Sequence, residues 1–155
     1  LPTGQTILQE KRDTLVVKNY KATGGSVLEG IPTVVLINDG SASASEITAG
    51  ALHDNKAATL MGVKSYGKGS VQQLEKFSDG SVLKVTIARW YTPGGININK
   101  EGIKHVTEVK LEEAKFKAGT DTQLDASKSY ITAKVCVTQC DSHYHFVLNH
   151  CSQVS

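Results

Sequence analysis

Three serines alternate with alanines in the stretch 41–46, which reads Ser-Ala-Ser-Ala-Ser-Glu. The stretch follows an apolar run at 34–37 and precedes a segment with helical periodicity, so it lies where a strand leads into a helix. The first backbone N–H groups of a helix have no intrahelical partner, and the helix dipole is positive there. A hydroxyl at this junction, above all that of Ser43, could therefore attack a carbonyl while neighbouring N–H groups stabilise the oxyanion.

A serine nucleophile needs a general base, because a free hydroxyl holds its proton too tightly. His53 is the histidine nearest in sequence, but on a helix that starts at Ser43 it lies nearly three turns away, roughly 15 Å by helical rise. The Gly-x-Ser-x-Gly pattern is absent as well, since Ser41 and Ser45 stand at its two glycine positions. The sequence therefore disfavours a Ser-His-Asp arrangement.

Lys68 is the other candidate base. It lies between Gly67 and Gly69, which allow the backbone a close approach. A lysine buried in a site favours its neutral amine, and a neutral amine can accept the proton of a serine. Gln72 follows four residues later in the next expected strand, where its amide could orient the amine. On spacing alone, an exposed turn lysine and serines that only cap the helix remain the plainer alternative.

The elements that would position these residues are short strands and helices, which predicts an α/β fold with a mixed sheet. The run 34–37 is β-branched or aliphatic throughout, as in a strand covered on both faces. With the helix after it and an apolar run at 58–63 it predicts a strand–helix–strand unit. Asp79-Gly80 indicates a hairpin turn. Strands are expected at 5–11, 14–20, 34–37, 58–63, 71–77 and 81–91, and helices at about 43–55 and 121–133.

Composition limits the classes of function. The chain has 155 residues and a formal net charge of +2, too small a charge to indicate a nucleic-acid partner. No apolar run reaches the roughly 18 residues of a membrane span, and no signal peptide opens the chain. The first residue is Leu1 and not Met, which predicts a fragment or a processed product.

Three blocks, 38–47, 66–73 and 88–95, together resemble the C-terminal processing proteases, also called tail-specific proteases. The resemblance runs from about residue 1 to residue 133. The serine block and the sequence Gly-Lys-Gly-x-Val-Gln at 67–72 are its most specific motifs. It implies that Ser43 is the nucleophile, that Lys68, 25 residues later, is the general base, and that Gln72 supports the lysine.

The same resemblance implies a mechanism and a setting. Ser43 would be acylated by the substrate and then deacylated by water, with the backbone N–H of Ala44 donating to the oxyanion. Asp54 occupies a position that some accounts of the family implicate, although a structural helix-end role is equally open to it. The implied core is a partial crotonase/ClpP-like protease fold without cofactor or metal. The implied substrates are unstructured protein C-termini, in an extracytoplasmic location such as the bacterial periplasm, the cell envelope or the exterior. Whether the chain forms homo-oligomers is left open by the resemblance.

We expect residues 1–134 to be the C-terminal part of a tail-specific protease catalytic domain. The family's PDZ domain, and the Asn-Pro-Gly-Gly segment that supplies its second oxyanion donor, would precede Leu1. The expectation is therefore little or no activity for this chain alone. One alternative is a non-catalytic binding or assembly domain that keeps the scaffold. Another is acyl-thioester chemistry on a crotonase-type fold, against which the pair Ser43 and Lys68 argues.

Residues 135–155 form an atypical tail that we expect to be disordered or non-native. The tail contains six side chains of the types that bind zinc. Their spacing matches no zinc finger, so no metal site is predicted. These side chains are Cys136, Cys140, His143, His145, His150 and Cys151.

Overall fold

The computed structural model describes residues 1–104 and 106–142, with side chains described as far as Val135. Its strands form two sheets. The antiparallel sheet has the order β2 (Leu15–Lys21), β1 (Thr6–Arg12), β6 (Val82–Tyr91), β5 (Ser70–Lys76). The parallel sheet has the order β3 (Val34–Ile37), β4 (Thr59–Gly62), β7 (Thr107–Glu108).

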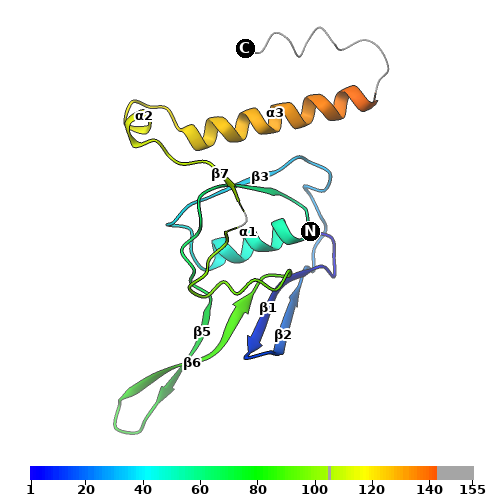
Figure 1. Ribbon diagram of the computed structural model, residues 1–155. Helices are drawn as coiled ribbons and strands as arrows, with labels where there is room; N and C mark the ends of the chain where they lie inside the picture. The colour runs from blue at the N-terminus through cyan, green and yellow to red at the C-terminus, as the bar shows by residue number, and fades with distance from the viewer. Residues whose placement is uncertain (105, 143–155) are drawn as a thin grey trace.

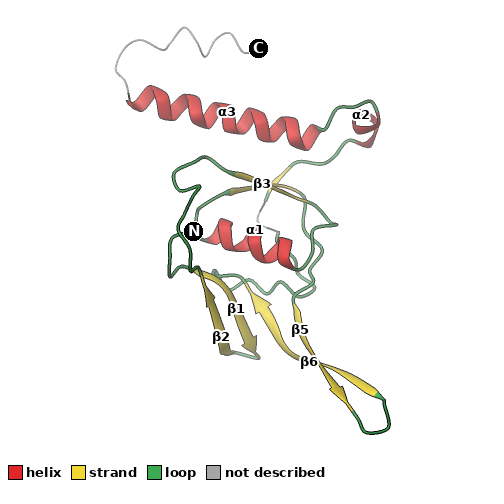
Figure 2. Cartoon of the chain, turned by 180° about the vertical axis from the view of Figure 1, so that it is seen from behind, coloured by secondary structure: helices red, strands yellow, loops and turns green. Residues whose placement is uncertain are grey.

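The helices lie on both sides of the parallel sheet (Figures 1 and 2). Helix α1 (Ala44–Asp54) lies between the two sheets, whereas α2 (Glu113–Lys117) and α3 (Thr122–Ser142) lie beyond β3 and β7. The architecture confirms the expected α/β class with short helices. Within the described part of the chain, no helix combines the length and the apolar character needed to cross a membrane.

Helix α1 packs closely because its buried face carries small residues, Ala49, Gly50 and Ala51. A Cβ added at Gly50 would lie 2.6 Å from the Cγ2 of Thr92, so the helix meets the end of β6 without room for a side chain. The core cluster next to α1 consists of Leu8, Ile37, Ala49, Leu60, Ile98 and Ile103.

The expected strand–helix–strand unit is confirmed as β3–α1–β4, with β3 and β4 parallel. Strands β1 and β2 form a first antiparallel hairpin, and the hairpin expected at Asp79-Gly80 is confirmed as β5–β6. The second hairpin continues as a two-stranded ribbon that projects from the rest of the molecule (Figure 1). Short α2 was not foreseen.

Helix α3 is longer than expected. It was predicted to end at about residue 133, but it runs to Ser142. No glycine or proline interrupts residues 122–142, so nothing in the backbone forces an earlier end. The expected domain boundary between residues 134 and 135 falls inside this helix and stays a prediction.

Candidate active site

Ser43 is the N-cap residue of α1, in a half-buried turn. Its φ of 53° lies in the left-handed region, which non-glycine residues seldom adopt, and its ψ is −112°. Backbone strain of this kind persists only where surrounding contacts enforce it, and it is common at active sites. Two contacts hold this turn. The Ser43 N–H donates to Oε2 of Glu46 at 2.9 Å, and its carbonyl accepts the N–H of Ile47 at 3.0 Å.

Glu46 joins the turn at Ser43 to residues 65–69 around Lys68, which we call the lysine turn. Its side chain is fully buried. Oε2 accepts the N–H of Ser43 at 2.9 Å and the N–H of Lys68 at 2.8 Å. Oε1 accepts the Ser65 hydroxyl and the N–H of Gly67, both at 2.6 Å. Because one oxygen atom binds both, the backbone nitrogens of Ser43 and Lys68 lie no farther apart than the sum of those two bonds.

Residues 98–103, which we call the strap, hold the lysine turn from its other side. The N–H of Lys100 donates to the Gly67 carbonyl at 2.8 Å. Ile103 bonds Ser65 twice, through its N–H to the hydroxyl at 2.7 Å and through its carbonyl to the Ser65 N–H at 3.2 Å. A Cβ added at Gly69 would lie 2.5 Å from the Asn99 nitrogen. The glycines around Lys68, which have no side chain, therefore allow the backbones of the turn and the strap to approach closely.

The side chain of Lys68 is exposed. Gln72 is exposed as well, on β5 just after a register shift, and its amide donates to Oγ1 of Thr86 at 3.5 Å. Among the described residues, no hydrogen bond joins Gln72 to Lys68. The structure thus brings the backbones of Ser43 and Lys68 together, while the Gln72 amide has its own partner.

Ala44 is the first residue of α1 and is exposed. In the described part of the chain, no hydrogen bond uses its backbone N–H, as is usual for the first turn of a helix. This donor lies directly after Ser43. It is available to an oxygen atom that approaches the serine.

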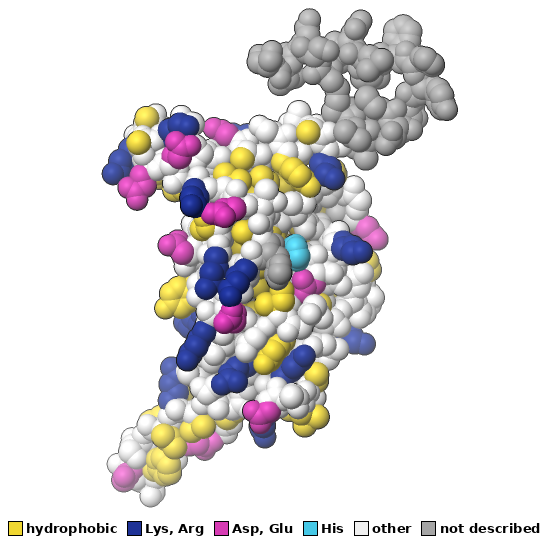
Figure 3. Space-filling view, viewed as in Figure 1, with side chains coloured by type: hydrophobic (Ala, Val, Ile, Leu, Met, Phe, Trp, Pro, Cys, Tyr) yellow, Lys and Arg dark blue, Asp and Glu magenta, His cyan; other side chains and the backbone are white. Residues whose placement is uncertain are grey.

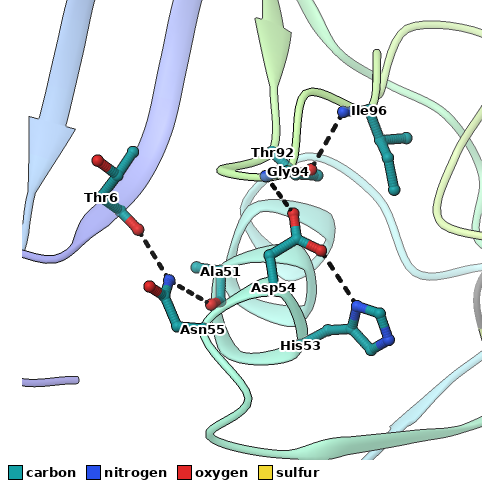
Figure 4. A network of polar contacts seen from close by, with 8 residues as sticks. All are labelled: Thr6, Ala51, His53, Asp54, Asn55, Thr92, Gly94 and Ile96. Atoms are coloured by element: carbon teal, nitrogen blue, oxygen red, sulfur yellow. Dashed lines mark hydrogen bonds and ion pairs between the residues drawn. The ribbon is translucent and has the colours of Figure 1, made fainter.

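Asp54 lies at the other end of α1, about 16 Å from Ser43 by helical rise. Figure 4 shows how it connects the helix to the turn after β6: Oδ2 accepts the N–H of Gly94 at 2.7 Å, and Oδ1 contacts Nδ1 of His53 at 3.1 Å. Burial by itself would raise the pKa of Asp54. Hydrogen bonds from Thr92, Gly94 and His53, with the attraction of His53, outweigh it and lower the pKa below the usual 3.8. The structure places Asp54 away from the serine.

Two residues of this site, Glu46 and Ser65, are not among the site residues predicted from the sequence. The spacing Ser-x-x-Glu at 43–46, typical of a capping box, was a local signal for the bond from Glu46 to the N–H of Ser43. Its bonds to 65–68 join segments about twenty residues apart, which no local pattern indicates.

Within residues 1–104 and 106–135, no three His, Cys, Asp or Glu side chains are grouped to hold a metal ion. The cysteines and histidines of the tail lie outside the part for which side chains are described.

Comparisons with known proteins show which family the chain belongs to. Residues 1–109 match the sequence model of peptidase family S41. The chain is 42% identical over 130 residues to a carboxy-terminal-processing protease of Bartonella bacilliformis, which covers 83% of this chain and 30% of the relative. It is 42% identical over 123 residues to a carboxyl-terminal-processing protease of Synechocystis, covering 77% of this chain and 29% of the relative.

A solved structure shares the fold. The photosystem II D1 C-terminal processing protease superposes with a TM-score of 0.64 at 39% identity, over 68% of this chain and 27% of that one. The chain thus spans less than a third of the length of the relatives named here. The chain belongs to peptidase family S41.

Proposed function

We propose that this chain carries the catalytic serine and lysine of a peptidase that cleaves unstructured protein C-termini. One observation carries the proposal: a single buried oxygen, Oε2 of Glu46, binds the backbone N–H of both Ser43 and Lys68. Residues 25 apart in sequence are thereby fixed side by side. One is a strained serine at a helix start, and the other is a lysine in a glycine-bordered turn.

The chemistry that suits this pair is acyl transfer. The neutral amine of Lys68 takes the proton of Ser43 as Oγ attacks the scissile carbonyl, so a C–O bond forms and the carbonyl becomes an oxyanion. The N–H of Ala44 stabilises that oxyanion. When the C–N bond breaks, the ammonium of Lys68 protonates the leaving amine. Water then attacks the acyl-enzyme, with Lys68 again as the base, and releases Ser43.

A neutral Lys68 requires that water be excluded from the amine. The side chain is exposed in the free chain, so we propose that the bound peptide covers it and favours the neutral form. In the complex, Gln72 would exchange its 3.5 Å contact with Thr86 for one with the amine. Asp54, at the far end of α1, would not touch the substrate and would only hold the helix to the turn after β6.

The whole protein's setting is also a proposal. Because the chain spans less than a third of its relatives, we propose that it is weakly active alone and that residues beyond it supply a second oxyanion donor. The proposed location is extracytoplasmic, in line with the family resemblance. The relatives include both bacterial and chloroplastic processing proteases.

Labelling with a fluorophosphonate probe tests the proposal, because the probe phosphonylates only an activated serine, with loss of fluoride. We expect the adduct on Ser43, no adduct in Ser43→Ala, and labelling at least about a hundredfold slower in Lys68→Ala. Ser45→Ala and Lys76→Ala are the matched controls and should label normally. Labelling that survives Lys68→Ala at full rate would remove the lysine from the mechanism. Absence of any adduct would favour a binding domain on a protease scaffold.

A further inference from the structure

The strap and the lysine turn together present a group of positive charges around Lys68. We call Lys64, Lys100 and Lys104 the basic rim. All three are exposed. Lys64 begins the loop that leads to Lys68, while Lys100 and Lys104 come from the strap and the residue just after it. In the space-filling view, Lys and Arg side chains are spread over the visible face, with Asp and Glu side chains between them (Figure 3).

Backbone contacts hold the rim beside the proposed base. The N–H of Lys100 donates to the carbonyl of Gly67, the residue before Lys68, at 2.8 Å. Lys100 itself has a φ of 65°, so its backbone is held in the left-handed region that a lysine seldom adopts. Two hydrogen bonds join Ser65 to Ile103. Lys64 precedes Ser65 and Lys104 follows Ile103, so these bonds hold the backbones of the two lysines near each other. The rim is therefore built by the same contacts that form the site.

One acid lies within the rim. Glu101 accepts a hydrogen bond from Lys104, and this bond with the attraction of Lys104 and Lys64 lowers the pKa of Glu101. No ion pair of the described residues involves Lys100. The three rim lysines and Glu101 leave a formal charge of +2 at this place, and Lys68 with the buried Glu46 beside it adds no net charge.

A concentration of one charge beside a reactive group attracts ligands of the opposite charge. An extended peptide advances about 3.3–3.6 Å per residue, so side chains two or three positions from the scissile bond can reach the surface around the lysine turn. We propose that the basic rim binds acidic side chains of the peptide substrate close to the bond that is cut. This inference rests on the proposed function for the identity of the ligand as a peptide.

The test is a binding measurement that needs no catalysis, made on the full chain carrying Ser43→Ala. Three short fluorescein-labelled peptides share one apolar sequence. The first contains two glutamates and an amidated C-terminus, the second replaces both glutamates by glutamine, and the third is the glutamine peptide with a free terminal carboxylate. Fluorescence anisotropy gives the affinity of each at about 0.05 M and about 0.5 M salt, since screening weakens exposed ion pairs.

We expect the glutamate peptide to bind about three- to tenfold more tightly than the amidated glutamine peptide at low salt, and the difference to close at high salt. The variant Lys64→Gln/Lys100→Gln/Lys104→Gln should abolish the difference. Lys110→Gln/Lys115→Gln/Lys117→Gln makes the same change in net charge at exposed lysines elsewhere and should preserve it.

Three results would overturn the inference: equal affinities for the first two peptides, a preference that survives in the rim variant, or no binding of any peptide. A gain produced only by the free terminal carboxylate would also overturn it, since the ligand would then be the chain end. Failure of the proposed catalysis is separate. It would appear as absent serine labelling while the preference for glutamate stands.

Discussion

The carboxyl group of Glu46 is fully buried and accepts four hydrogen bonds. Burial of an unpaired carboxylate is costly, but three backbone N–H groups and one hydroxyl satisfy both oxygens. Without Glu46, these three N–H groups and the hydroxyl would lose their hydrogen-bond acceptor. At the scale of single residues, this carboxylate determines where the nucleophile and the base lie.

Glu46→Gln tests that role with almost no change of shape. The amide can offer only one acceptor oxygen, and its NH2 group would face N–H or O–H donors. We expect a loss of about 2–3 kcal/mol in the free energy of unfolding, measured by urea denaturation, together with slower labelling of Ser43. Glu113→Gln, on the exposed face of α2, should change stability by no more than about 0.5 kcal/mol. Equal effects of the two substitutions would refute the role assigned to Glu46.

Asp54 gives a prediction about pH. Its pKa is lowered in the folded chain, so the folded state binds the Asp54 proton less readily than the unfolded state does. The resulting stability is present above the ordinary pKa of 3.8 and is lost as the pH falls through the lowered value. The difference in unfolding free energy between wild type and Asp54→Asn should therefore be larger at pH 6 than at pH 3. A difference that is constant or grows toward pH 3 would contradict the sign.

At the scale of elements, the site is a contact between three segments: the start of α1, the lysine turn and the strap. The sequence was sufficient to predict the first two, because apolar runs, helical periodicity and flanking glycines are local signals. The strap falls within residues 96–112, for which irregular chain or a short strand is expected. Its role depends on bonds from Lys100 and Ile103 to residues 65–67, and pairings over more than thirty residues leave no periodic trace.

Gly69→Ala tests the contact between the turn and the strap. The new methyl group would lie 2.5 Å from the backbone nitrogen of Asn99, so the strap must shift. We expect a loss of about 1–3 kcal/mol in unfolding free energy, as in other overpacked sites, and reduced labelling of Ser43. Gly24→Ala is the matched control, since nothing lies within 4 Å of its added Cβ. Wild-type stability and labelling in Gly69→Ala would show that the strap does not hold the turn.

At the scale of the molecule, the fold leaves large apolar side chains uncovered. On the ribbon of β5 and β6, the side chains of Leu74, Phe77 and Val82 are each more than half exposed. The sequence predicted both strands and their register-setting turn, but burial depends on what packs against them. The α/β class, the strand–helix–strand unit and the family could all be predicted. Whether Lys68 is a buried base or an exposed turn lysine was left open, because its burial depends on neighbours that sequence spacing does not identify.

The single oxyanion donor proposed for this chain predicts slow turnover. With the Ala44 N–H as the oxyanion donor supplied by this chain, hydrolysis of an unstructured tail peptide should be at least about a hundredfold slower than by the full-length carboxy-terminal processing protease CtpA of Bacillus subtilis. Mass spectrometry of the products under identical conditions gives both rates. Comparable rates would show that no further oxyanion donor is needed.

The central claim, that Lys68 activates Ser43, can be tested most directly with a peptide p-nitrophenyl ester. Such an ester needs little help in losing its leaving group, so acylation can be seen even where amide hydrolysis is slow. We predict an acyl adduct on Ser43, with one p-nitrophenolate released per adduct. Its formation should be normal in Ser45→Ala and Lys76→Ala, at least about a hundredfold slower in Lys68→Ala and absent in Ser43→Ala. An adduct on another residue, or acylation of Ser43 at an unchanged rate in Lys68→Ala, would contradict the account.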